Sequence, residues 1–240
     1  MINRFQYTGT EWRKMTVKAI IFDLDGTITS FNVDYKTVRT EVKSLFVANG
    51  LPSSILSSNE SIFDMFKKVE IFLRNNGESE KKMEELRSKA LKIAEKHEYE
   101  AAKITSLLPG APEALKSAKN MNLKVGLCTI NSEKATCYIL KRFKIADLFD
   151  VVITREKVKQ VKPNPEHLQV TLNALEVKSG EAIFVGDGSR DMLCARELKV
   201  LAVGLATGIS TSKELTASGA NYLITSITDL SSLIERLNKP

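Results

Sequence analysis

Near its N-terminus the chain contains the stretch Val17-Lys18-Ala19-Ile20-Ile21-Phe22-Asp23-Leu24-Asp25-Gly26-Thr27. Its first half is short, apolar and β-branched, which predicts a strand buried on both faces of a parallel sheet. Two acidic residues follow at alternate positions, and Gly26 allows the backbone to turn sharply after them. Because ligands of an open parallel sheet bind beyond the carboxyl ends of its strands, this stretch predicts a site built on paired carboxylates.

Similar apolar runs recur along the chain and alternate with segments of helical spacing. The helical segments are residues 111–121, 133–143 and 165–175. This alternation predicts right-handed βαβ units and an α/β, Rossmann-like parallel sheet covered by helices on both faces. The predicted strands after the first are Lys124–Thr129, Val151–Thr154, Ala182–Val185 and Val200–Val203, with a weaker one at Tyr222–Ile224.

Residues 31–107 interrupt the alternation with a segment in which no buried strand is predicted. Helical patterns cover Tyr35–Ala48, Ser61–Asn75 and a long charged stretch from Ser79 to Ile104. The simplest interpretation is an all-helical domain inserted after the first strand, with residues 15–30 and 108–240 forming the sheet domain. The polar residues 1–14 are predicted to be a flexible extension.

Two other predicted strand ends and one predicted helix start place polar residues at the same edge of the sheet. Thr129 ends the second strand, Lys162-Pro163 opens a later helix, and Gly186-Asp187-Gly188-Ser189-Arg190-Asp191 follows the fourth strand. The acids of strands one and four can meet only if the first strand is central, which predicts the order 5-4-1-2-3 for the five core strands. The alternative without a functional site is a set of strand-end turns whose acids are solvated.

The gathered residue types suit phosphoryl transfer. Carboxylate oxygens are the ligands that Mg²⁺ prefers, and a phosphoryl group needs its charge neutralised by a metal, a lysine and hydrogen-bond donors. A carboxylate nucleophile can divide hydrolysis into two steps through an aspartyl-phosphate. A second acid can protonate the leaving oxygen and then deprotonate the attacking water.

The ordered set Asp23-x-Asp25-Gly26-Thr27, Thr129, Lys162-Pro163 and Gly186-Asp187-x-x-x-Asp191 resembles the haloacid dehalogenase-like (HAD) hydrolase superfamily, and phosphoglycolate phosphatases with a helical cap in particular. The resemblance implies that residues 31–107 form the cap, which closes over the site and excludes water. It also implies the role of each site residue. Asp23 is the nucleophile and a Mg²⁺ ligand, Asp25 the general acid/base and a ligand through its carbonyl, Thr129 and Lys162 bind phosphate, and Asp187 and Asp191 bind or support Mg²⁺.

The implied activity is Mg²⁺-dependent hydrolysis of a small phosphorylated metabolite, such as a phosphoglycolate-like compound or a sugar phosphate. Asp25 favours a phosphatase over a dehalogenase, because a leaving alkoxide needs a proton and a leaving halide does not. A phosphomutase of the β-phosphoglucomutase type is an open alternative, and so is a non-catalytic phosphate-binding protein on the same fold.

Composition limits the partners that we expect. The 240 residues carry 35 Lys and Arg against 29 Asp and Glu, but no stripe of basic residues with interleaved aromatics occurs, so no nucleic-acid partner is expected. No apolar run approaches the ~20 residues of a membrane span, and the first residues lack the apolar centre of a signal peptide. We expect a cytoplasmic monomer or homodimer with no membrane partner and with free thiols. His97 and His167 lie in charged helical stretches and are expected at the surface.

Overall fold

The computed structural model describes residues 6–7 and 16–238. The chain divides into two compact units. One combines residues 1–31 with residues 105–240, and the other consists of residues 32–104. The first unit therefore consists of two separate segments of the chain. They are hydrogen-bonded to each other near the boundary, where the Ser30 N–H donates to the Ser106 carbonyl at 2.8 Å.

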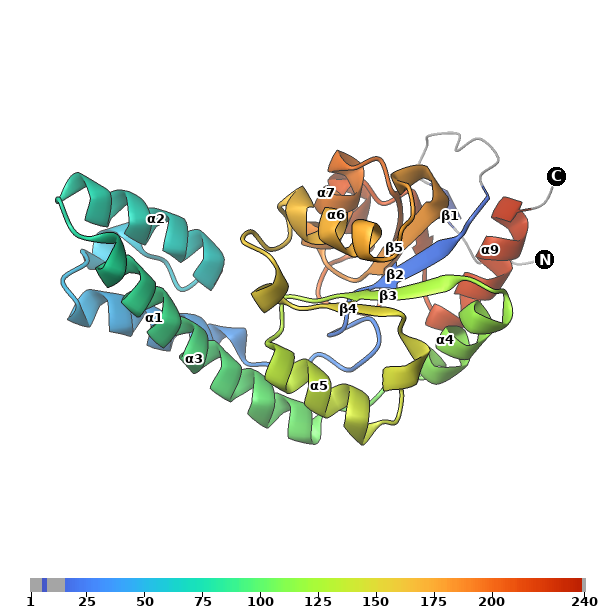
Figure 1. Cartoon of the computed structure of the whole chain (residues 1–240), viewed down its shortest axis with the longest axis horizontal. Coiled ribbons are helices and arrows are strands. Elements are labelled where there is room, and N and C mark those ends of the chain that lie inside the picture. The colour runs from blue at the N-terminus through green and yellow to red at the C-terminus, as the bar shows by residue number, and fades with distance from the viewer. Residues whose placement is uncertain (1–5, 8–15, 239–240) are drawn as a thin grey trace. The chain divides into compact units, whose positions relative to one another are not determined.

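The larger unit is built on one sheet whose central strands are parallel (Figure 1). Its strand order is β1-β7-β6-β5-β2-β3-β4, so the five core strands β2 to β6 follow the predicted order 5-4-1-2-3, which is confirmed. The motif-bearing strand β2 lies between β3 and β5, with Ile21 in register with Gly126 on one side and Phe184 on the other. The core strands are β2 (Ala19–Phe22), β3 (Lys124–Cys128), β4 (Val151–Ile153), β5 (Ala182–Gly186) and β6 (Leu201–Leu205).

Two further strands extend the sheet beyond β6. The weakly predicted strand is present as β7 (Tyr222–Ile224) and pairs parallel with β6. Gln6–Tyr7 form β1, which pairs antiparallel with β7, so at these two residues the predicted flexible extension is wrong. Backbone hydrogen bonding to an open sheet edge needs no apolar pattern, which is why the sequence of this polar segment did not show it. The other residues of the predicted extension lie outside the described residues.

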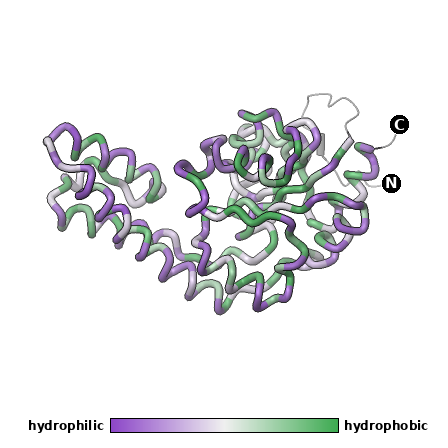
Figure 2. The backbone as a smooth tube through the Cα atoms, viewed as in Figure 1, coloured by the Kyte–Doolittle hydropathy of each residue, from purple (hydrophilic) through white to green (hydrophobic). Residues whose placement is uncertain are grey.

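Helices cover both faces of the sheet. On one face residues of α6, α7 and α8 share one hydrophobic core with Ala19 and Ile21 of β2. On the other face α4 and α9 lie together (Figure 1). The strands carry the most hydrophobic stretches of the chain, as expected for a sheet buried on both sides (Figure 2). The helices of this unit are α4 (Ala111–Asn120), α5 (Glu133–Arg142), α6 (Pro165–Ala174), α7 (Ser189–Glu197), α8 (Ser212–Ser218) and α9 (Leu230–Asn238).

The smaller unit consists of helices and has its own core. Its helices are α1 (Tyr35–Ala48), α2 (Ile62–Asn75) and α3 (Glu80–Ile104). Asp34 and Ser61 cap the first two, each accepting hydrogen bonds from backbone N–H groups of the first turn. The core is closed by apolar side chains at helical spacing, and the rings of Phe46 and Phe66 meet edge to face at 6.1 Å. Across residues 6–7 and 16–238, no helix is long and apolar enough to cross a membrane.

The helical unit allows a matched test of its core on one helix. Met65 is 0% exposed and Ile71 is 61% exposed, and both lie on α2. We expect Met65→Ala to lower the free energy of unfolding by about 2–5 kcal/mol, because it leaves a cavity. Ile71→Ala should change it by no more than about 0.5 kcal/mol. Urea denaturation of the two variants measures both, and equal losses would contradict this core.

Candidate functional site

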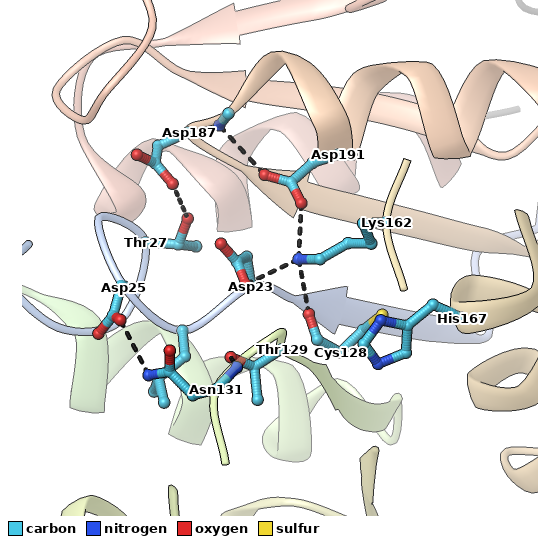
Figure 3. A network of polar contacts seen from close by, with 12 residues as sticks. Asp23, Asp25, Thr27, Cys128, Thr129, Asn131, Lys162, His167, Asp187 and Asp191 are labelled. Carbon is cyan, nitrogen blue, oxygen red and sulfur yellow. Dashed lines mark hydrogen bonds and ion pairs between the residues drawn. The ribbon is translucent and has the colours of Figure 1, made fainter. Parts of the chain in front are cut away.

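The carboxyl ends of β2, β3 and β5 bring the predicted site residues to one edge of the sheet (Figure 3). Asp23 directly follows β2, and its N–H donates to the Val185 carbonyl of β5 at 2.9 Å. Asp187 follows β5, and Asp191 lies two residues into α7. Ligand atoms of these three carboxylates all lie within 4.8 Å of one another. Residues far apart in the sequence therefore form one compact acidic cluster.

Lys162 is the cation inside this cluster. It is 3% exposed, and its Nζ lies 2.8 Å from Asp23 Oδ1 and 2.7 Å from Asp191 Oδ1. It also donates to the Cys128 carbonyl at 2.8 Å, so these three acceptors match the three hydrogens of the ammonium. A phosphate oxygen that receives a hydrogen bond from Lys162 must therefore replace one of them.

The charges of the cluster do not balance in the ionised state. Three carboxylates and one ammonium leave a net charge of −2 in a site where Asp187 is 2% exposed and Asp191 3%. Burial, followed by the repulsion of Asp23 and Asp191, raises the pKa of Asp187 to about 7. Burial also raises the pKa of Asp191 to about 6, although Lys162 opposes that rise. One divalent cation carries the missing charge, so the donor set fits a hard cation such as Mg²⁺.

Asp187 is positioned by the loop that follows β6. The N–H of Ile209 donates to its Oδ2 at 2.7 Å, and the hydroxyl of Thr27 lies 3.3 Å from its Oδ1. Two glycines leave room for this carboxylate. A Cβ at Gly26, where φ is +80°, would lie 2.2 Å from Asp187 Oδ2, and one at Gly208 would lie 2.0 Å from the same atom. Side chains at either position would displace the carboxylate.

Asp25 lies apart from the acidic cluster, although it is only two residues from Asp23. Its Oδ1 accepts from the hydroxyl of Thr29 at 3.1 Å, and its Oδ2 accepts from Nδ2 of Asn131 at 2.8 Å (Figure 3). Its carboxylate is not among the three that could hold a metal. Metal binding by Asp25 through its backbone carbonyl stays a prediction. The two motif acids therefore occupy different environments.

Thr129 is buried at the end of β3, at the edge where the acids gather. Its Oγ1 accepts from the N–H of Asn131 at 3.2 Å, which leaves the hydroxyl hydrogen able to donate to a phosphate oxygen. The chain then enters α5, whose N-cap is Ser132. The phosphate-binding role of Thr129 stays a prediction.

Sequence reasoning missed two features of this edge. Asn131 was not singled out, although a polar side chain two residues after a predicted strand end lies at the same rim. The loop at residues 206–210 was missed as well, because its contribution is the backbone N–H of Ile209 and the absence of a side chain at Gly208. The position of this loop after the fifth core strand was the available signal.

The prediction for His167 was wrong, because the side chain is buried rather than at the surface. It lies one turn before Thr171 on the inner face of α6, with its Nε2 3.3 Å from the Ile153 carbonyl. Burial, with the charge of Lys162 second, lowers the pKa of His167 to about 3, so the ring is neutral. Cys128 and Cys194 are buried, as free thiols, and burial raises the pKa of both, to about 12 and about 11. Neither is a ready nucleophile.

Comparison with known proteins gives a consistent assignment. Residues 20–205 match the sequence model of the family described as haloacid dehalogenase-like hydrolase. A pyrophosphatase named PpaX from Bacillus cereus is 25% identical over 230 residues, which cover 94% of this chain and 100% of that relative. Among solved structures, a hydrolase from Pseudomonas syringae has a TM-score of 0.66 and 26% identity, with 92% and 100% of the two chains covered. A predicted phosphoglycolate phosphatase from Haemophilus somnus shares the fold, with a TM-score of 0.61, 19% identity and 90% and 97% covered.

The raised pKa values predict a pH-dependent effect of metal on stability. A carboxyl whose folded pKa exceeds its unfolded value of about 3.9 destabilises the metal-free fold as pH rises through the folded pKa. For Asp187 and Asp191 that window extends from about pH 4 to about pH 7. Bound Mg²⁺ must displace these protons, so we expect it to raise the melting temperature strongly at pH 8 and little at pH 5.

Thermal unfolding with and without Mg²⁺ at several pH values measures this effect. At a free Mg²⁺ concentration 100 times the dissociation constant, binding raises the free energy of unfolding by about 2.7 kcal/mol. Asp187→Asn is the control. It removes one buried negative charge, so we expect the metal-free variant to be at least as stable as the wild type at pH 8 and to lose most of the response to Mg²⁺. An equal response of wild type and variant would exclude Asp187 as a ligand.

Proposed function

The chain belongs to the haloacid dehalogenase-like hydrolase family, and from this premise we propose that it is a Mg²⁺-dependent phosphomonoester hydrolase that acts through an aspartyl-phosphate on Asp23. The observation that carries the proposal is the geometry around Asp23. Its carboxylate is paired with Lys162 and lies beside Asp187 and Asp191, while the chemically distinct Asp25 is two residues away.

The first half-reaction transfers the phosphoryl group to the enzyme. A carboxylate oxygen of Asp23 forms a bond to phosphorus, and the bond between phosphorus and the leaving oxygen breaks. Asp25 supplies the proton that the leaving alkoxide needs. Lys162, whose Nζ lies 2.8 Å from Asp23 Oδ1, adds positive charge where the phosphoryl oxygens gather, and Thr129 donates a hydrogen bond there.

The second half-reaction releases orthophosphate. Water attacks phosphorus, Asp25 takes up its proton, and the bond between phosphorus and the Asp23 oxygen breaks. The proton that Asp25 gave in the first half is thereby returned, and the enzyme is restored. Asp25 suits this exchange because it lies outside the cluster of Asp23, Asp187 and Asp191 and is only half buried.

Asp23, Asp187 and Asp191 would hold the Mg²⁺ ion, with the Asp25 carbonyl as a further ligand. When bound, the ion supplies positive charge that balances both the cluster and the phosphoryl oxygens. Asp191 already has both oxygens engaged, by Lys162 and by the Gly188 N–H at 3.1 Å, which favours a supporting role for it.

Two substrate classes are supported by different observations. Asp25, which lies outside the acidic cluster, suits a phosphomonoester, such as a phosphoglycolate-like compound or a sugar phosphate, whose alkoxide leaves only with a proton. The full-length similarity to a protein named as a pyrophosphatase makes inorganic pyrophosphate the second candidate. Its leaving group is phosphate, which needs less protonation.

Substitutions of the two motif acids should separate their roles. We expect Asp23→Asn to abolish turnover and the covalent intermediate, because an amide is not a nucleophile. Asp25→Asn should still bind Mg²⁺ and lower the rate on an alkyl phosphate roughly 10²–10⁴-fold, with a smaller loss on an aryl phosphate. Phosphate release measures both, and wild-type activity of Asp25→Asn on an alkyl phosphate would remove Asp25 as the acid.

A screen of phosphorylated metabolites together with inorganic pyrophosphate identifies the substrate class. We expect kcat/KM to be highest for a small phosphomonoester, with activity lost in chelator and restored by Mg²⁺ but poorly by Ca²⁺, whose coordination shell is larger and looser. A kcat/KM for pyrophosphate above that of every monoester would select the second candidate, and full activity in chelator would exclude the metal.

A further inference from the structure

We propose that Asn131 is a positioning residue that orients Asp25 for proton transfer, an inference that rests on the proposed function. The contact that carries it is the hydrogen bond from Asn131 Nδ2 to Asp25 Oδ2 at 2.8 Å, which joins the end of β2 to the end of β3 (Figure 3). The two residues are 106 positions apart in the sequence, so only the sheet brings them together.

Asn131 is held firmly enough to orient another side chain. It is 2% exposed, and its N–H donates to Thr129 Oγ1 at 3.2 Å. Its carbonyl lies 3.5 Å from the N–H of Arg155, and a guanidinium N–H of the same buried arginine points to the Ile130 carbonyl at 3.4 Å. Ser132 follows as the N-cap of α5. The backbone of Asn131 is therefore tied to a strand end, a helix start and a neighbouring loop.

Asp25 is less constrained without this contact. It is half buried, and its carboxylate also accepts a hydrogen bond from Thr29, four residues along the same turn. The Thr29 hydroxyl also lies 3.3 Å from the Leu24 carbonyl, so its donation is shared between two acceptors. Asn131 reaches Asp25 from the end of a different strand and thereby sets the direction of the carboxylate relative to Asp23 and Thr129.

The same residue links the acid to the predicted phosphate-binding hydroxyl. Its side chain contacts Asp25 while its backbone N–H contacts Thr129. Proton transfer requires the acid to lie within hydrogen-bond reach of the leaving oxygen. By binding both groups, Asn131 fixes the spacing between the site of the phosphoryl group and the proton that its leaving oxygen receives.

The test is a double-mutant cycle with two substrates. We expect Asn131→Ala to lower kcat on an alkyl phosphate roughly 10-fold to 100-fold, the effect of losing one hydrogen bond to a charged group. On an aryl phosphate, whose leaving oxygen hardly needs a proton, the loss should be at most about threefold. In the Asp25→Asn background Asn131→Ala should cost no more than about twofold, because residues that act as a unit are non-additive.

Two further variants separate hydrogen bonding from packing. Asn131→Asp keeps the size of the side chain but replaces the donor by an acceptor, so we expect at least the loss seen with alanine. Asn173→Ala is the matched control, because Asn173 is exposed on α6 of the same unit, and we expect wild-type rates from it. Thermal unfolding of every variant checks that it is folded.

The outcomes distinguish this inference from the proposed function. A large loss in Asp25→Asn with wild-type rates in Asn131→Ala would overturn the inference and leave the proposed function intact. Equal losses on the alkyl and aryl phosphates, or additive losses in the double variant, would also overturn it, because Asn131 would then act independently of Asp25. If the wild type released phosphate from no phosphomonoester, both would fail together.

Discussion

The structure at the carboxyl edge of the sheet depends on one electrostatic constraint, the close approach of three carboxylates, two of them buried, to a single ammonium. Burial and the repulsion of neighbouring carboxylates raise the pKa of Asp187 and of Asp191. Lys162 offsets part of this repulsion by bonding Asp23 and Asp191 at the same time. The remaining net charge of −2 is balanced by one divalent cation, so a bound metal ion would stabilise this arrangement.

The surroundings of Asp187 and Lys162 are arranged around that constraint. Asp187 occupies a space bounded by Gly26 and Gly208, neither of which can carry a side chain without displacing it. Lys162 donates its third hydrogen bond to the carbonyl of Cys128, which holds the ammonium against the end of β3. Small residues and backbone groups thus position the charged side chains, and each of them comes from the end of a different strand or from the loop after it.

The two motif acids show how one turn can hold two kinds of carboxylate. Asp23 is paired with Lys162 inside the acidic cluster, whereas Asp25 lies outside that cluster and accepts hydrogen bonds from Thr29 and Asn131. Two titratable groups in contrasting environments are the usual arrangement when one serves as nucleophile and the other carries protons. The two side chains point toward different neighbours, Asp23 toward Lys162 and Asp25 toward Asn131 (Figure 3).

By itself the sequence determined the α/β class, the strand order of the core and the edge at which Asp23, Lys162, Asp187 and Asp191 gather. The reason is that buried parallel strands and amphipathic helices have distinct periods, and acids at strand ends of such a sheet must share one edge. Only the tertiary structure decided that His167 is buried, that β1 adds to the sheet, and that Asn131 and the Ile209 N–H reach the acids. These features depend on backbone hydrogen bonds and on contacts between distant strands. Such contacts produce no periodic pattern and no bias in composition, so the sequence alone does not show them.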